Sequence, residues 1–188
     1  MLKADSEIKF TYQDYLLMPD DRRYELIEGD LRMVPAPNEA HQRVSKKIEF
    51  RLIQSLEEVG SAYVYDAPVD VVFSDETAVQ PDILVISKER KNIITKEHIR
   101  GAPDLIIEIL SPHSLERDRI IKKKLYGKFG VREYWIVDPE SQSIEVLVWK
   151  QKGLKTWRTF PKGSIASSFL FKDVKFAVDD IFSGDPTV

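Results

Sequence analysis

Apolar residues recur along the chain at two spacings, and these spacings predict where helices and strands form. From residue 37 to residue 59 the apolar positions recur every three or four residues, which is the spacing of one helical face. The members of this apolar stripe are Val44, Ile48, Leu52, Leu56 and Val59. His41 lies three residues before the first of them and shares their face. The pattern predicts a helix that begins at Pro37 and Asn38 and extends to about Val59.

The segment before this helix carries two local signals. Thr11 and Asp14 have the spacing of a capping box, which predicts a short helix that ends before Pro19. Residues 24–35 read YELIEGDLRMVP, and they predict two short strands joined by a turn at the Glu-Gly-Asp triplet.

The middle of the chain predicts extended structure. Residues 61–74 (SAYVYDAPVDVVFS) suit two extended segments, and residues 80–87 (QPDILVIS) suit one strand. Residues 88–102 are polar and predict a loop with a short helical turn at 95–99. Residues 104–110 (DLIIEIL) are apolar on both faces, which is typical of a central strand covered by helices on each side.

The last third of the chain adds one helix and several strands. Ser114 can cap a helix from about residue 115 to residue 129, which ends at Gly130. The following strands are predicted at residues 132–138, 143–150 and 154–160, with further short β segments near 169–178. Because helices and strands alternate, the sequence predicts an α/β (α+β) fold, with one mixed central β-sheet flanked by helices. The 188 residues suit a single domain over 1–188.

Composition excludes several classes of site. The chain has no cysteine, which excludes disulfides, thiolate metal sites and cysteine nucleophiles. A metal site must then use carboxylates, histidines and carbonyls, a ligand set that favours Mg²⁺ or Mn²⁺. No segment approaches the ~20 uninterrupted apolar residues of a membrane-spanning helix. The first ten residues, MLKADSEIKF, have no signal-peptide core, so the expected location is cytoplasmic, without a membrane partner.

Net charge gives only weak guidance about partners. The formal charge of −3 argues against a protein coated in positive potential for nucleic acid. A local patch can still dominate encounter, and residues 122–124 (KKK) and the basic scatter from Lys150 to Lys162 could supply one.

Glu108 is unusual because it stands inside the apolar run 104–110. A buried carboxylate is costly unless a metal, a cation or hydrogen-bond donors receive it. Alternate residues of a strand share a face, so Glu108 lies with Asp104, Ile106 and Leu110. Asp82 begins the strand at 80–87 directly after a proline, and the two acids converge if the two strands are neighbours. A divalent cation between them would remove their repulsion.

The helix predicted after Ser114 offers a lysine to the same place. Its apolar face contains Ile121, Leu125 and Phe129, and Asp118, Lys122 and Tyr126 lie on or beside that face. Lys123 and Lys124 point away from it, so only the first lysine of the triplet is predicted to face the sheet. There it can pair with the acids, orient an attacking water or stabilise charge on a phosphate.

These residues match a known family. The chain resembles the Uma2 (DUF820) group, whose members are assigned to the restriction-endonuclease-like PD-(D/E)XK fold, over about residues 11–182. The resemblance lies in YELIEGDL (24–31), His41, PDILVIS, PDLIIEILSP and DRIIKKKLYGKFGVREYWIVDP (118–139).

The resemblance implies a residue for each catalytic role. Asp82 matches the first acid and Glu108 the second, and with the carbonyl of Ile109 they would hold Mg²⁺, Mn²⁺ being the alternative ion. The usual lysine position falls on Leu110, and Lys122 matches a lysine that has moved to the neighbouring helix.

Two further residues complete the implied site. Glu28, which adjoins the Gly29 turn, is the upstream acid assigned here, and Glu25, which alternates with Leu26, remains the alternative. His41 is expected to support the ligands or to contact phosphate, and a core histidine is the competing interpretation.

The implied activity is Mg²⁺-dependent endonucleolytic hydrolysis of DNA, with DNA as partner and a homodimer where both strands are cut. A non-catalytic nucleic-acid-binding module of the same fold is the alternative, as is a phosphodiesterase acting on RNA or nucleotides. A two-carboxylate glycosidase would have no role for Lys122 or a metal.

Each of the three main site residues also has a purely structural interpretation. Asp82 could cap the start of its strand, and Glu108 could form an ion pair with Lys122 without a metal. Lys122 could instead pair with Asp118 on a helix surface. Asp104 is expected to be structural.

Overall fold

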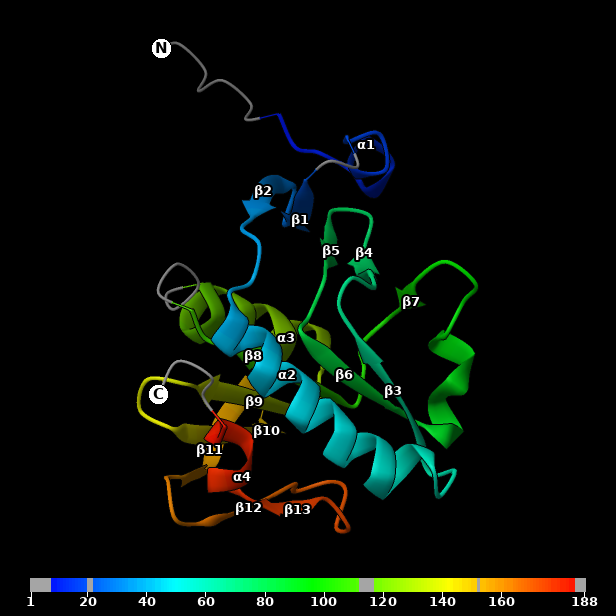
Figure 1. Ribbon diagram of the computed structural model, residues 1–188. Helices are drawn as coiled ribbons and strands as arrows, with labels where there is room; N and C mark the ends of the chain where they lie inside the picture. The colour runs from blue at the N-terminus through cyan, green and yellow to red at the C-terminus, as the bar shows by residue number, and fades with distance from the viewer. Residues whose placement is uncertain (1–7, 20–21, 112–116, 152, 185–188) are drawn as a thin grey trace.

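A six-stranded mixed sheet forms the centre of the protein, whose computed structural model describes residues 8–19, 22–111, 117–151 and 153–184 (Figure 1). In spatial order its strands are β11 (Gly153–Phe160), β10 (Ser143–Lys150), β9 (Glu133–Asp138), β8 (Leu105–Ile109), β6 (Ile83–Ser87) and β3 (Ala62–Asp66). Neighbours are antiparallel except β8 and β9, which are parallel. The predicted fold class, with a mixed central sheet flanked by helices, is confirmed, although the sequence predicted one sheet and the structure adds a five-stranded second sheet and a two-stranded hairpin.

β8 is the central strand that the sequence predicted. All five of its residues are buried, and β6 and β9 flank it on either side. Its odd-numbered residues, such as Leu105 and Ile107, belong to one hydrophobic cluster, whereas Ile106 and Leu110 belong to another on the opposite face. Glu108 shares the face of Ile106, as the alternation predicts.

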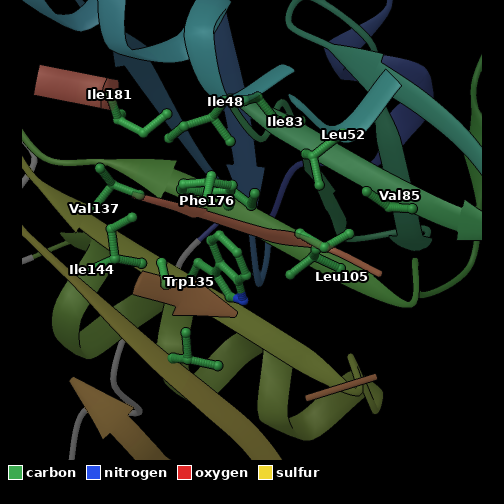
Figure 2. Packing of buried hydrophobic residues seen from close by; sticks show 14 of the residues in the cluster. Ile48, Leu52, Ile83, Val85, Leu105, Trp135, Val137, Ile144, Phe176 and Ile181 are labelled. Atoms are coloured by element: carbon green, nitrogen blue, oxygen red, sulfur yellow. The ribbon is translucent and has the colours of Figure 1, made fainter. Parts of the chain in front are cut away.

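The first face of the sheet is covered by α2 (Glu39–Leu52), the short π-helical segment η1 (Ile53–Glu57) and α4 (Val178–Phe182) (Figure 1). Figure 2 shows Ile48 and Leu52 of α2 in one cluster with sheet residues such as Trp135, and with Phe176. The Asn38 side chain accepts a hydrogen bond from the His41 amide and caps α2, so this helix begins where the sequence predicts. Four members of the predicted stripe are buried; Val59 is 67% exposed, because the helix ends before it, and its assignment was wrong.

The second face carries the crossover between the parallel strands β8 and β9. It contains the π-helical segment η3 (Arg117–Lys122), which continues into α3 (Lys123–Phe129). Gly130 has φ +82° and ends α3, a left-handed conformation that glycine adopts without steric cost. The predicted cap Ser114 lies outside the described residues. The wide π turn was not predicted, yet Lys122 still faces inward.

A smaller sheet packs beside α3 on this second face. Its order is β2 (Asp30–Val34), β1 (Arg23–Ile27), β5 (Thr77–Val79), β4 (Val71–Ser74) and β7 (Ile99–Arg100). β1 and β2 form the predicted hairpin, whose turn residues Glu28 and Gly29 both have positive φ. Next to it, α1 (Tyr12–Tyr15) has the predicted capping box at Thr11. The sheet brings the β1 side chains toward the crossover.

Three smaller elements complete the fold. Residues 88–102 contain a 3₁₀ helix (η2, Lys88–Ile93) and β7, so the helical turn predicted at 95–99 was misplaced. The tail forms the hairpin β12 (Ile165–Ser167) and β13 (Lys175–Ala177). Among the described residues no helix is both long and apolar enough to cross a membrane.

Asp104 stands immediately before β8 and is fully buried. It forms ion pairs with two arginines, which gives it a structural role. Its Oδ2 accepts a hydrogen bond from the Ser87 amide at 2.8 Å. Its Oδ1 accepts bonds from Arg90 at 3.0 Å and Arg132 at 2.9 Å. Burial by itself raises the pKa of Asp104, but these donors outweigh burial and hold it below its usual value.

Replacing Asp104 with asparagine is expected to lower the free energy of unfolding by about 2–3 kcal/mol at pH 7, because the negative charge is lost and the amide nitrogen must face either the Ser87 N–H or the two arginines, all of which are donors. A carboxylate with a lowered folded-state pKa contributes stability above its unfolded pKa, near ~3.9, and loses it as the pH falls through the folded value. Urea unfolding at pH 7 and pH 3 should therefore show a smaller difference between the two proteins at pH 3. An equal difference at both pH values would contradict this assignment.

Candidate functional site

A cavity of about 300 Å³ opens where the start of α2 meets the adjoining ends of β6 and β8. The small sheet supplies Glu25 to its wall, and the crossover supplies Lys122. Asp82 and Glu108 line the same cavity. With His41 of α2 included, five segments of the chain therefore place ionisable side chains around one space.

Strand register brings the two predicted acids together. β6 and β8 are antiparallel with Ile83 opposite Ile107, so continuing the register by one residue sets Asp82 opposite Glu108. The Ile109 amide donates a hydrogen bond to Asp82 Oδ2 at 2.7 Å, which fixes that carboxylate at the end of β8. The predicted convergence of the two acids is thus present in the structure.

Lys122 is buried against carboxylates. Its Nζ lies 2.8 Å from Glu108 Oε1, 2.8 Å from Glu25 Oε1 and 3.9 Å from Asp118 Oδ1. Its side chain is 2% exposed, whereas Lys124 is exposed, so the predicted facing of the lysine triplet is correct for these two. A pair between Lys122 and Asp118 on the helix surface does not describe this geometry, because both side chains are buried.

Burial and charge act in opposite directions on these groups. Burial by itself lowers the pKa of Lys122, but the carboxylates of Glu108, Glu25 and Asp118 raise it above its ordinary value. Burial raises the pKa of Glu108 well above its ordinary value despite the nearby ammonium group. Tyr126, predicted to lie on or beside the same helical face as Lys122, donates a 2.5 Å hydrogen bond to the same Oε1 of Glu108.

His41 contacts the other acid. Its Nε2 lies 3.0 Å from Asp82 Oδ2, and α2 holds the ring near the cavity from its first turn. Burial by itself raises the pKa of Asp82, but its interactions with His41, the Ile109 amide and Lys122 together outweigh burial and keep the pKa below its usual value. His41 Nδ1 is buried without a hydrogen-bond partner among the described residues.

The structure brings Glu25, rather than Glu28, to the cavity. Glu25 is 1% exposed and lies on β1 facing Lys122. Glu28 is an exposed turn residue whose carboxylate pairs with Lys128 at 2.7 Å, outside the cavity lining. The placement assigned to Glu28 was therefore wrong, because the positive-φ turn directs it away from the face that carries Glu25.

Asp118 was predicted to lie on or beside the inward face with Lys122 but was given no role in the site, and Arg117 was not predicted there. Asp118 is 1% exposed, and Arg117 Nε lies 3.4 Å from its Oδ1. The spacing of four residues from Asp118 to Lys122 and on to Tyr126 was the available signal, since it sets all three on one side of a helix. Arg117 had no comparable signal in the sequence.

The donor atoms suit a hard divalent cation. If Glu25, Asp82, Glu108 and Asp118 are all ionised, the lysine and arginine side chains of the lining, namely Arg23, Arg117 and Lys122, leave an excess of one negative charge. Glu25 Oε2 is also buried without a hydrogen-bond partner in the described residues. Carboxylate oxygens of Asp82 and Glu108 with a main-chain carbonyl match the oxygen ligands of Mg²⁺. In the described ranges no three acidic, histidine or cysteine side chains already form a metal cage.

Comparisons with known proteins give the same fold and name a family. A family model described as "Putative restriction endonuclease", Uma2, matches residues 12–179. The crystal structure of "a putative nuclease belonging to DUF820" from Anabaena variabilis has a TM-score of 0.78 and 23% sequence identity. That match covers 93% of this chain and 98% of the other, and it shows the restriction-endonuclease-like fold. No curated protein matches the sequence. Because the family model covers most of its length, this chain belongs to the Uma2 family.

Proposed function

We propose that this protein is a Mg²⁺-dependent endonuclease that hydrolyses DNA phosphodiester bonds. The observation that carries the proposal is the buried Lys122 ammonium between Glu25 and Glu108, in the cavity that Asp82 also lines. The family description of a restriction endonuclease supports the reaction class.

Asp82, Glu108 and the carbonyl oxygen of Ile109 are proposed to hold the cation. A Mg²⁺ ion held by these residues would supply a more acidic coordinated water and would offset charge on a scissile phosphate. His41 orients Asp82 through its 3.0 Å contact, and the Ile109 amide holds the same oxygen. Preorganised ligands of this kind cost little reorganisation during the reaction.

Lys122 is proposed to position the attacking water and to stabilise negative charge on the phosphate. Its contacts at 2.8 Å to Glu25 and Glu108 fix the direction of its donors. Tyr126 donates a hydrogen bond to the same oxygen of Glu108 that Lys122 contacts. The lysine thus takes, from the neighbouring helix, the role that the position of Leu110 has in the general PD-(D/E)XK pattern.

A non-catalytic nucleic-acid-binding module is the second candidate. The ion pairs of Lys122 already satisfy part of the buried carboxylate charge without a metal. A phosphodiesterase for RNA or nucleotides is a third, since a cavity of about 300 Å³ suits a small substrate.

Two aspartates that each follow a proline before a strand offer a matched test of the proposal. Asp82→Asn is expected to lower Mg²⁺-dependent cleavage of plasmid and single-stranded DNA by about 10²–10³-fold, because one metal-binding carboxylate is lost. Asp104→Asn should keep its cleavage rate when assayed well below its melting temperature, because Asp104 belongs to an ion-pair centre outside the cavity.

Each variant is assayed with Mg²⁺, Mn²⁺ and EDTA, on DNA, RNA and a small phosphodiester. Cleavage that persists in EDTA would refute metal dependence. DNA binding without cleavage in any metal would favour the non-catalytic module, and cleavage confined to RNA or the small ester would favour the phosphodiesterase.

A further inference from the structure

Arg23 differs from the other basic side chains that line the cavity. Lys122 is paired with Glu25 and Glu108, and Arg117 with Asp118. The Nε of Arg23 donates instead to a neutral acceptor, Gln80 Oε1, at 3.0 Å. Within the part of the chain that the structure describes, no carboxylate forms an ion pair with Arg23. Its positive charge is therefore available to an anion in the cavity.

Gln80 holds this arginine in one orientation. The Gln80 Nε2 donates to Asp70 Oδ1 at 2.9 Å and to the Tyr15 hydroxyl at 3.2 Å. Because both acceptors take the amide nitrogen, the amide oxygen is left to face Arg23. Tyr15 also donates to Asp70 at 2.8 Å, which closes the network. Arg23 is thus preorganised, and its remaining guanidinium nitrogens face a fixed direction.

Strand β1 sets this arginine beside the acids. Arg23 and Glu25 are two residues apart in β1, so they share a face, and both line the cavity. Gln80 stands two residues before Asp82 and lines it as well. The same two segments therefore fix the distance between Arg23 and the proposed metal-binding residues.

A hollow beside the cavity carries acidic side chains. A neighbouring hollow shares Asn38, His41 and Ser111 with the cavity and is lined by Asp138 and Glu140. Its lining, in the described residues, contains no lysine or arginine. A polyanionic strand that reaches Asp82 and Glu108 therefore finds a cation on the Arg23 side.

We infer that Arg23 binds a backbone phosphate of the nucleic-acid strand, beside the phosphate that reacts, and that Gln80 is its positioning residue. The inference rests on the proposed function for the identity of the polyanion. A guanidinium group presents paired N–H donors that match phosphate oxygens, and here it enters the site already oriented.

Binding to a fluorescein-labelled single-stranded 16-mer, followed by anisotropy in EDTA over a range of NaCl concentrations, tests the inference without requiring catalysis. Arg23→Ala is expected to weaken binding about tenfold at low salt, as loss of a charge-assisted contact does. The slope of log affinity against log salt should fall by about 0.7, because one phosphate contact to a single strand is lost. Arg23→Lys should keep the wild-type slope and recover part of the affinity.

Two more variants separate positioning from general charge. Gln80→Leu keeps the charge of Arg23 but removes the amide acceptor, so affinity should fall while the salt slope stays at the wild-type value. Arg22→Ala removes the adjacent, exposed arginine, which does not line the cavity, and should change affinity by less than about twofold. Thermal melting of each variant checks that the fold is retained.

In a cleavage assay, Arg23→Ala should raise KM about tenfold with kcat near the wild-type value, as expected for a residue that binds substrate and transition state equally. Equal losses for Arg22→Ala and Arg23→Ala, or no loss for Arg23→Ala, would overturn the inference even if the protein cleaves DNA. Binding that depends on Arg23 without cleavage in any metal would overturn the proposed catalysis alone. A wild-type protein that neither binds nor cleaves the oligonucleotide would overturn both.

Discussion

Replacing Glu108 with glutamine is expected to lower metal-dependent DNA cleavage by about 10³-fold. The carboxylate is 2% exposed and lies in the cavity with Asp82 and Lys122. An amide has the same shape but no negative charge, so it would hold Mg²⁺ poorly and would leave the metal-bound water less acidic. A barrier increase of about 4 kcal/mol gives this factor. Single-turnover cleavage of a labelled oligonucleotide in saturating Mg²⁺ is the measurement.

The same variant should fold about as stably as the wild type, within about 1 kcal/mol. Burial already raises the pKa of Glu108, so its ionised form is poorly stabilised, and the amide removes repulsion with Glu25, Asp82 and Asp118. Glu28→Gln is the matched control, since that glutamate lies on the exposed turn and pairs with Lys128. It should cleave at the wild-type rate. Equal losses in Glu108→Gln and Glu28→Gln would contradict the site described above.

Replacing Lys122 with methionine is expected to remove cleavage and, unlike the change at Glu108, to destabilise the fold. The variant would leave Glu25, Glu108 and Asp118 buried around an apolar side chain. Breaking a buried ion pair by removing one partner costs about 3–5 kcal/mol in the free energy of unfolding. Urea unfolding at pH 8 measures this loss, and Lys124→Met, on the exposed side of the same helix, should change stability by less than about 0.5 kcal/mol.

The destabilisation caused by Lys122→Met should depend on pH, and the direction of that dependence follows from the pKa of Lys122. The raised pKa of Lys122 means that its contribution is fully present below the pKa of the unfolded chain and is lost as the pH rises through the folded-state value. In the methionine variant the buried acids would bind protons more tightly in the folded state than in the unfolded chain. The destabilisation should therefore decrease between pH 8 and pH 5. A loss that is independent of pH would show that packing, rather than charge, causes it.

The sequence predicted most of what depends on local periodicity. Continuous apolar character identified β8 as the central strand and made Glu108 conspicuous within it. The helical stripe of α2 and the Asn38 cap follow from spacing and from one hydrogen bond. The inward orientation of Lys122 was predicted in the same way, although the segment forms a π-helical turn. Each of these features depends on residues that lie close to one another in the sequence.

Which glutamate serves as the upstream acid of the candidate site was decided by long-range packing. Glu25 and Glu28 stand three residues apart, and alternation alone does not say which face of β1 meets the crossover. The small sheet decides it, because it turns Glu25 toward Lys122, while the hairpin turn leaves Glu28 in solvent beside Lys128. Val59 was wrongly assigned to the buried stripe because the helical segment ends at Glu57, before this residue, and leaves it exposed.

The sequence by itself determined the family, the central sheet and four side chains of the candidate site, namely Asp82, Glu108, Lys122 and His41. Only the tertiary structure decided that Glu25 rather than Glu28 joins them, that Asp118 is buried beside Lys122, and that Arg23 is held by Gln80 at the same cavity. The physical reason is that hydrophobic periodicity is a local property of the chain. The meeting of charged groups from β1, β6, β8 and the crossover depends on how two sheets pack against one helix.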